Sequence, residues 1–584
     1  MSKWAKRILS LTLAALLLTC FFQPAFAEGE APEQALSTAP AAGEDVSKYP
    51  LIFGAGAWHP LYTNEERWLP KSLAPGSPME TVFSTENTLG GDAGSMGSIL
   101  SSLTSLDMDA FGDGLVQLWE NSYGSIAMDA DGKSINPAIS CVIPYLTYLG
   151  TKYSTFTDNP AAYAPLDETM NKIKAAGALG ENKAFWTFDW RQSPVRNADL
   201  LHAYIEKLIG LYGEGNTHDG GNHNGYAGEP FDKVNFNAIS GSGPIALAYL
   251  KKYGHLNRLS SLVFNISMHN GSSLFGNIAL GDFGFDAASL AQGGLSMFGL
   301  QDSKVGGGGD KAIFGLSPRL IEGLYQLGLL DTLLNAFNFA ARGAYKKFYE
   351  QALIPIWFQM PAYLCMIPNK DYEAAKKYLF KDDPKYAKLL ADADEYHAIM
   401  AEQDDLILKA AAKLKVAVRC GYGSPLSPYA VGANVSSDKL VDTYYASLGA
   451  TCAAPGRPFS IFYRQKKFRD TRDYISPDRC VDASTCLLPD VTWFAKGLPH
   501  TAQWDYSGWY GWWLAAKDYT IRDNEKYPQY SQWIAKAEGE TADTFIPLVA
   551  AEADWVTGLK SIGLSLLAAW RWIILLPLIW MKWL

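Results

Sequence analysis

The sequence predicts an α/β fold with a mainly parallel sheet, helices on its faces and a large inserted helical cap. Strand-like apolar runs alternate with helical patterns between residues 183 and 274, and this alternation is typical of a parallel sheet. Between residues 275 and 414 helical patterns follow one another without strands. Strand-like runs return at residue 415. We therefore expect a cap at 275–414 between two parts of the core, at 50–274 and 415–550.

The first strand of the core is expected at residues 50–53, directly before Gly54-Ala55-Gly56-Ala57. In a hydrolytic enzyme of this layout, the loop after an early strand donates a backbone N–H to an oxyanion. Its residues must be small so that the substrate can approach. A simple glycine turn is the alternative.

Residues 233–250 lie at the centre of the predicted core, as a short apolar strand, a turn of tiny residues and a helix. This order is typical of a nucleophile elbow, in which a strained turn exposes a serine hydroxyl at the end of a strand. The nucleophile would be Ser240 or Ser242, although neither has the strict G-x-S-x-G pattern around it. A plain strand-to-helix turn is the alternative.

Two helices are expected from their apolar spacing, at residues 200–212 and, inside the cap, from Ser317-Pro318 to Phe337 along one continuous face. The remaining strands of the core are expected at residues 183–189, 262–264, 415–418, 459–463 and 492–495.

The N-terminus predicts export. Cationic residues precede the apolar run Ile8–Leu18, and Ala25-Phe26-Ala27 resembles a small-residue cleavage site. We therefore expect a signal peptide at 1–27, followed by a flexible leader at 28–48 that is rich in Ala, Glu, Pro and Ser. The expected location is outside the cytoplasm.

The C-terminus predicts membrane association through residues 556–584. From Ile562 to Leu584 the chain is nearly all apolar and is long enough to cross a bilayer, and it carries four tryptophans, which favour the interface. Arg571 near its middle would cost about 3 kcal/mol in a spanning helix. A spanning helix, a surface helix and a buried core helix all remain open.

Charge and composition restrict the partners. Without the signal peptide, 47 Lys and Arg stand against 60 Asp and Glu, so nucleic acid is not an expected partner. Aromatic residues make up 13% of the chain, and 18 of them are tryptophans, which favours apolar ligands or a membrane surface.

No metal or organic cofactor is expected. Residues 214–228 contain His218, Asp219 and His223, but a solvated loop is the favoured interpretation over a metal site. The stretch Asp129–Lys133 lacks most ligands of a calcium loop and is expected to form a hairpin turn. Six cysteines follow residue 27, an even number that permits disulfides in an exported chain without specifying their pairing.

Two residues after the cap would complete a catalytic triad. Asp438 follows a predicted strand, and His500 follows the late strand at 492–495. In the α/β-hydrolase fold, the triad residues occur along the chain in this order: serine, then aspartate, then histidine. In such a triad the imidazole removes the serine proton and the carboxylate fixes the ring. Each residue alone would more often be an ordinary surface residue.

Two motifs give the chain a resemblance to the lecithin:cholesterol acyltransferase family of lipid acyltransferases and phospholipases. Phe188-Asp189-Trp190-Arg191 resembles the family's Tyr-Asp-Trp-Arg signature, and residues 233–250 are similar to its elbow without gaps. The segment from Asp438 to Thr443 is similar to the family's acid segment. The departures are Ala238, Ile239, Ser242 and Lys439, where the family has Gly, His, Gly and Gly.

The resemblance implies roles for individual residues. It makes Ser240 the nucleophile, with Ser242 as the alternative two residues later, and it implies that the backbone N–H groups of Ala57 and Gly241 bind the oxyanion. It also implies a disulfide between Cys420 and Cys452. Cys480 and Cys486 are a second candidate pair, separated by five residues.

The expected function is that of an exported serine esterase that acts on a lipid ester through an acyl-enzyme. Phospholipase or lipase activity is expected first and O-acyltransferase activity second. The altered elbow leaves a catalytically inactive lipid-binding surface protein as an alternative from another class. A peptidase on the same fold is disfavoured by the family motifs and the apolar C-terminus.

Overall fold

The computed structural model describes one compact unit of the chain, within Ala39–Leu584. The residues that it describes are 46–59, 61–63, 81–83, 99, 101–102, 105, 107–135, 139–140, 182–213, 229–293, 318–427, 429–430, 432, 434–468, 472–500, 509–515, 520–521, 527–536 and 545–549. The predictions for the signal peptide at 1–27, most of the leader at 28–48, the histidine-rich loop at 214–228 and the segment at 556–584 lie outside these residues.

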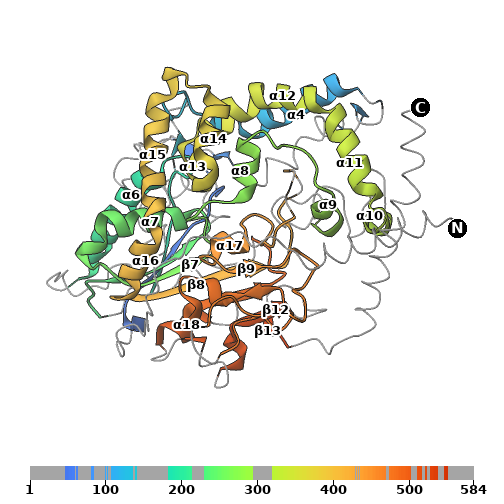
Figure 1. Cartoon of the computed structure of the whole chain (residues 1–584). Coiled ribbons are helices and arrows are strands. Elements are labelled where there is room, and N and C mark those ends of the chain that lie inside the picture. Colours follow the sequence, from blue (N-terminus) through green and yellow to red (C-terminus); the bar gives the residue numbers. More distant parts are fainter. Residues whose placement is uncertain are drawn as a thin grey trace. The chain divides into compact units, whose positions relative to one another are not determined.

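The core is a sheet of eight strands in the order β13-β12-β11-β8-β7-β6-β1-β5. All neighbouring strands are parallel except β12 and β13, which are antiparallel. The predicted α/β fold with a mainly parallel sheet is confirmed (Figure 1). The strands are β1 (Leu51–Gly54), β5 (Lys183–Trp186), β6 (Val234–Ile239), β7 (Leu259–Asn265), β8 (Lys415–Tyr422), β11 (Thr492–Lys496), β12 (Trp533–Lys536) and β13 (Phe545–Pro547).

Helices cover both faces of this sheet. On one face α6 (Pro194–Tyr212) and α7 (Ser242–Tyr253) pack on each other, and α15 (Ala387–Ala401) packs on both. On the other face, α18 (Trp509–Ala515) places Tyr510 against the ring of Phe53 and accepts a hydrogen bond from Asn265. The helix predicted at 200–212 is therefore present as part of α6.

The described residues between 275 and 414 are mainly helical, but the last helices of this region do not lie apart from the core. Both α15 and α16 (Gln403–Ala411) pack on α7, and α16 also contacts β8, so these two helices belong to the layer on the sheet. The preceding helices that Figure 1 labels are α8 (Ser273–Ala279), α9 (Ala287–Gly293), α10 (Pro318–Gln326), α11 (Leu329–Ala340), α12 (Arg342–Phe348), α13 (Pro361–Cys365) and α14 (Asn369–Phe380). A π-helix (Tyr349–Trp357) lies between α12 and α13.

Two predictions of local structure are wrong. The helix expected to run to Phe337 is interrupted at Gly328, whose φ of 63° belongs to the left-handed region, so α10 and α11 do not share one continuous face. Residues 459–463 form no strand, and Ile461 and Phe462 are exposed instead of lying in the sheet. Alternating apolar residues predict a strand only if a neighbouring strand can pair with them, and none lies there among the described residues.

Shorter elements complete the described chain. The helix α4 (Met108–Tyr123) packs on α12, and the expected turn at Asp129–Lys133 is confirmed, because Asp129 N donates to Lys133 O at 2.8 Å. The other short elements are β2 (Leu61–Thr63), β3 (Thr81–Phe83), β4 (Ile139–Ser140), α17 (Thr443–Ala446), β9 (Thr451–Cys452), β10 (Val481–Asp482), and 3-10 turns at Val46–Lys48, Gly124–Ile126, Gly254–Leu256, Pro384–Tyr386, Ala483–Thr485, Pro489–Val491 and Pro528–Tyr530.

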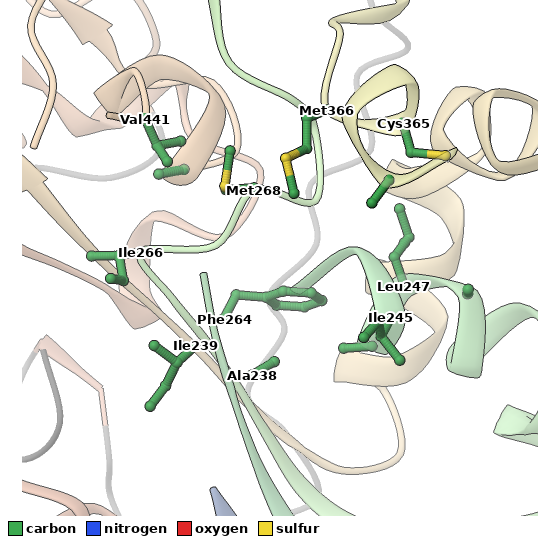
Figure 2. Close-up of a cluster of buried hydrophobic side chains, with 14 of the residues drawn as sticks. Ala238, Ile239, Ile245, Leu247, Phe264, Ile266, Met268, Cys365, Met366 and Val441 are labelled. Atoms are coloured by element: carbon green, nitrogen blue, oxygen red, sulfur yellow. The ribbon is translucent and has the colours of Figure 1, made fainter. Parts of the chain in front are cut away.

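The core below the candidate site joins the sheet to the helical region. Figure 2 shows one part of it, in which side chains come from β6, β7, α7, α13 and the segment around Val441. Phe264 of β7 and Ile245 of α7 belong to this cluster and are at most 1% exposed. Because successive residues of a strand point to opposite faces, Phe264 faces α7 while Asn265 faces α18.

The predicted disulfides are absent from the structure. Cys420, Cys452, Cys480 and Cys486 are all free thiols. The sulfur of Cys420 lies against the carbonyl oxygen of Trp493, and that of Cys452 lies against the carbonyl oxygen of Ala450. Within the described part of the chain, no helix is both long and apolar enough to span a bilayer.

Candidate active site

The order of the strands determines where a site can form. The chain passes from β1 to β5 on one side and then continues with β6 on the other side of β1. In an open parallel sheet, such a reversal leaves a crevice beyond the carboxyl ends of the two strands, where ligands bind. The loop after β1 and the turn after β6 both lie at this reversal.

The turn after β6 has the strained geometry of an elbow. Ser240 has a φ of 50°, a left-handed conformation that is unfavourable for any residue but glycine. Hydrogen bonds hold it there, because Ser240 N donates to Asn265 O at 3.0 Å and Ser240 O accepts from Gly243 N at 2.9 Å and Met268 N at 3.2 Å. The strain is therefore maintained by both β7 and the first turn of α7.

The structure brings Ser240, His500 and Asp438 together. The oxygen Oγ of Ser240 lies 2.7 Å from His500 Nε2, and His500 Nδ1 lies 2.8 Å from Asp438 Oδ2. All three side chains are buried, with at most 7% of any of them exposed. Both distances are within the range of hydrogen bonds between a nucleophile, its base and the group that orients the base.

The segment around Asp438 fixes the carboxylate. Its Oδ1 accepts hydrogen bonds from Leu440 N at 3.1 Å and Val441 N at 2.8 Å, which leaves Oδ2 for the imidazole. The next residue, Lys439, has a φ of 82°, in the left-handed region that glycine adopts most easily. Gly421 at the end of β8 leaves room for the acid, because a Cβ there would lie 2.7 Å from the Cβ of Asp438.

Ser242 does not face the imidazole. It is the first residue of α7, is fully buried and donates its hydroxyl to Ile239 O at 2.8 Å. Its side chain packs on Gly54 of β1, where an added Cβ would lie 2.7 Å from Ser242 Oγ. Of the two candidate nucleophiles, only Ser240 contacts His500.

The loop after β1 lies against the elbow. A Cβ on Gly241 would be 2.8 Å from Ala57 N, and a Cβ on Gly56 would be 3.4 Å from the Cβ of Ser240. Neither Ala57 N nor Gly241 N has an acceptor among the described residues. Two backbone donors beside the serine are what an oxyanion requires.

Side chains from distant segments hold this loop. Trp58 has a φ of 63°, and its Nε1 donates to the hydroxyl of Tyr363 in α13 at 2.7 Å. The Trp190 indole donates to His59 O at 2.9 Å, and His59 Nδ1 lies 2.9 Å from Gly56 O. Burial lowers the pKa of His59 to about 4, so the ring is neutral at pH 7 and its Nδ1–H donates to Gly56.

A pocket adjoins the two backbone donors. It is a small depression open to solvent, with enclosed room for about one water molecule. Most of its surface is apolar, while Gln192 and Asn197 are its polar side chains. Its lining residues are Ala57, Phe188, Trp190, Gln192, Pro194, Asn197, Gly241, Pro244, Ile245, Ala362 and Met366.

The Phe188–Arg191 motif builds one wall of the pocket and ties it to the 3-10 turn after α4. Arg191 is fully buried, forms two hydrogen bonds to the carboxylate of Asp189 at 2.9 Å each, and donates to Ile126 O at 3.1 Å. Burial raises the pKa of Asp189, but the charge and hydrogen bonds of Arg191 outweigh it and leave that pKa below its usual value. The ion pair therefore has a structural role.

Within the described residues, no group of three or more His, Cys, Asp and Glu side chains could hold a metal ion. The side chains that meet at the site are a hydroxyl, an imidazole and a carboxylate.

No protein-family model matches the chain, and no curated protein is significantly similar to it.

The structure brings together Ser240, Asp438 and His500, which the sequence predicted. The side chains that support the loop after β1 were not predicted. Trp58 and Tyr363 are 305 residues apart and have no local pattern that connects them. The sequence offered one weak sign that His59 supports this loop, namely its position two residues after Gly54-Ala55-Gly56-Ala57.

Proposed function

We propose that the protein is an exported serine esterase of the α/β-hydrolase fold that acts on lipid esters. The observation that carries this proposal is the continuous set of contacts from Ser240 through His500 to Asp438, at 2.7 and 2.8 Å. The fold assignment is supported by the position of the serine after the central strand β6 and by the chain order serine, aspartate, histidine.

The proposed chemistry has two halves. His500 Nε2 takes the proton of Ser240 as Oγ attacks the ester carbonyl carbon, and the N–H groups of Ala57 and Gly241 stabilise the negative oxygen. The imidazolium then gives its proton to the leaving alkoxide, which departs as an alcohol. In the second half, water or another alcohol attacks the acyl-enzyme with His500 as base, and Ser240 is regenerated.

The substrate class is supported by the resemblance to lipid acyltransferases and phospholipases and by the apolar pocket beside the proposed oxyanion donors. Hydrolysis by a phospholipase or lipase is the first form of the activity, and O-acyl transfer is the second. The signal peptide expected at 1–27 supports export.

Labelling with a fluorophosphonate probe tests the proposal. The mature chain should be labelled, and both Ser240→Ala and His500→Ala should lose labelling. Each variant should also lose turnover, by about a millionfold, because the members of a triad act as a unit. Ser242→Ala is the matched control and should keep most of its labelling. An unlabelled but folded chain would instead favour a catalytically inactive lipid-binding protein.

A further inference from the structure

Residues 457–468, which we name the 457–468 loop, expose large apolar side chains. Ile461, Phe462 and Phe468 are 74%, 81% and 77% exposed. Scattered exposed apolar residues are ordinary on a protein surface, but three such residues within one short loop form a local patch.

Cations accompany these apolar side chains. Arg457, Arg464, Lys466 and Lys467 are all exposed, and the sequence from 453 to 468 contains no acidic residue. None of the four forms an ion pair within the described residues, although Asp404 of α16 lies near enough to Lys467 to interact with its charge. The loop is thus a basic and aromatic patch on a chain whose net charge is −10.

The loop is held in shape by the protein beneath it. Arg479 donates through Nη2 to the carbonyl oxygens of Ser460 at 2.6 Å and Tyr463 at 3.2 Å. Asp482, which is fully buried, accepts from Lys466 N at 2.9 Å and from the Tyr463 hydroxyl at 2.8 Å. The exposed side chains are therefore presented by an anchored scaffold.

The same scaffold connects the loop to the candidate active site. Asp478, the residue before Arg479, forms an ion pair with Lys496 at 2.9 Å and accepts from the Tyr422 hydroxyl at 3.2 Å. Lys496 ends β11 and Tyr422 ends β8, and His500 follows Lys496 by four residues. The loop is therefore linked, through Asp478 and Arg479, to the carboxyl edge of the sheet.

We propose that the 457–468 loop is a docking surface for an anionic lipid membrane. Aromatic side chains partition into the interface of a bilayer, while lysine and arginine bind anionic head groups. A highly charged soluble partner such as nucleic acid would match the cations but would leave Ile461 and Phe462 in water. Docking here would bring the carboxyl edge of the sheet to the lipid surface.

This surface differs from the apolar segment expected at 556–584, so the test must report on the loop itself. A solvatochromic fluorescent amino acid at position 462 in the full chain should shift its emission to the blue when phosphatidylglycerol-containing vesicles are added. The same amino acid at position 339 is the control, because Phe339 in α11 is also exposed, at 66%. Its emission should not change.

The charge dependence has a matched control within the chain. Lys466-Lys467-Phe468 has the same sequence as Lys346-Lys347-Phe348 in α12, but Phe348 is buried. Lys466→Ala/Lys467→Ala should raise the lipid concentration that gives half of the emission shift at position 462 by about 30-fold. Each cation is expected to strengthen binding to an anionic surface by a factor of about 5. Lys346→Ala/Lys347→Ala should leave it unchanged.

The proposal is overturned if the chain binds vesicles without an emission change at 462, or if neutral phosphatidylcholine vesicles give the same shift. Binding to soluble polyglutamate as tightly as to vesicles, with no shift, would also overturn it. Measurements on Ser240→Ala protein avoid lipid hydrolysis and keep this test independent of the proposed esterase activity. A failure of one proposal can then be distinguished from a failure of the other.

Discussion

Gly243 in the first turn of α7 shows how little space surrounds the elbow. A Cβ added there would lie 1.7 Å from Ser267 Oγ and 2.7 Å from Ser267 Cβ, and Ser267 is fully buried. We expect Gly243→Ala to lower the free energy of unfolding by about 1 to 3 kcal/mol, because a tightly packed site cannot accept an added methyl group. Urea denaturation measures this.

The control is Gly210→Ala in α6, where an added Cβ meets no atom within 4 Å. It should raise the free energy of unfolding by up to about 1 kcal/mol, because alanine favours a helix over glycine. Equal effects of the two substitutions would contradict the packing argument.

One segment contains two buried aspartates with different contacts, and we expect one to orient the imidazole and the other to support the backbone. Asp438 contacts His500 Nδ1, whereas Asp442 accepts a hydrogen bond from Ser273 N at 2.7 Å. We expect Asp438→Asn to fold and to reduce kcat on a short-chain ester by about 10⁴, because the amide favours the wrong tautomer of the imidazole. Steady-state kinetics measures this loss.

Asp442→Asn should keep most of the activity, since an amide oxygen can still accept from a backbone N–H. If Asp442→Asn were the inactive variant and Asp438→Asn the active one, the assignment of the acid would be wrong.

At the scale of elements, the loop after β1 depends on α13. The hydrogen bond between Trp58 Nε1 and the Tyr363 hydroxyl joins two segments that are far apart in the chain. Trp58→Phe and Tyr363→Phe should each reduce kcat by about tenfold with a small effect on KM, because a backbone donor to the oxyanion acts mainly in the transition state.

The double variant should be no slower than either single variant, since both remove the same bond. Kinetics of the complete mutant cycle tests this. Additive losses would mean that the two side chains act separately and that α13 does not position the loop.

For the whole molecule, buried histidines make stability depend on pH. Burial lowers the pKa of His269 to about 3 and those of His59 and His397 to about 4, against 6.5 in the unfolded chain. Below pH 6.5 the unfolded chain binds protons that the folded chain does not. The free energy of unfolding should therefore fall, by about 1.4 kcal/mol per pH unit for each histidine, until the pH reaches the folded pKa.

His269→Gln should reduce the loss of stability between pH 7 and pH 5 by about 2 kcal/mol, whatever its effect at pH 7. His255→Gln is the control, because His255 is exposed. Chemical denaturation at both pH values measures the difference. An unchanged loss in His269→Gln would show that another group carries the pH dependence.

The parallel sheet was predictable because strands and helices alternate in the sequence, and each apolar run at 50–53, 262–264, 415–418 and 492–495 became a strand of the sheet. The elbow was predictable because a strained turn requires tiny residues beside Ser240. The 459–463 pattern failed for the opposite reason. A strand requires a partner strand, and the sequence does not say whether one lies beside it.

The α/β class, the residue types of the candidate site and their order along the chain follow from the sequence alone. The contact of Ser240, but not Ser242, with His500 is visible only in the tertiary structure, because two serines two residues apart differ in the direction of their side chains. The same holds for the free thiols of the four cysteines, the packing of α15 and α16 on the sheet layer, and the hydrogen bond from Trp58 to Tyr363. Each of these depends on contacts between distant segments, and local sequence patterns carry no information on such contacts.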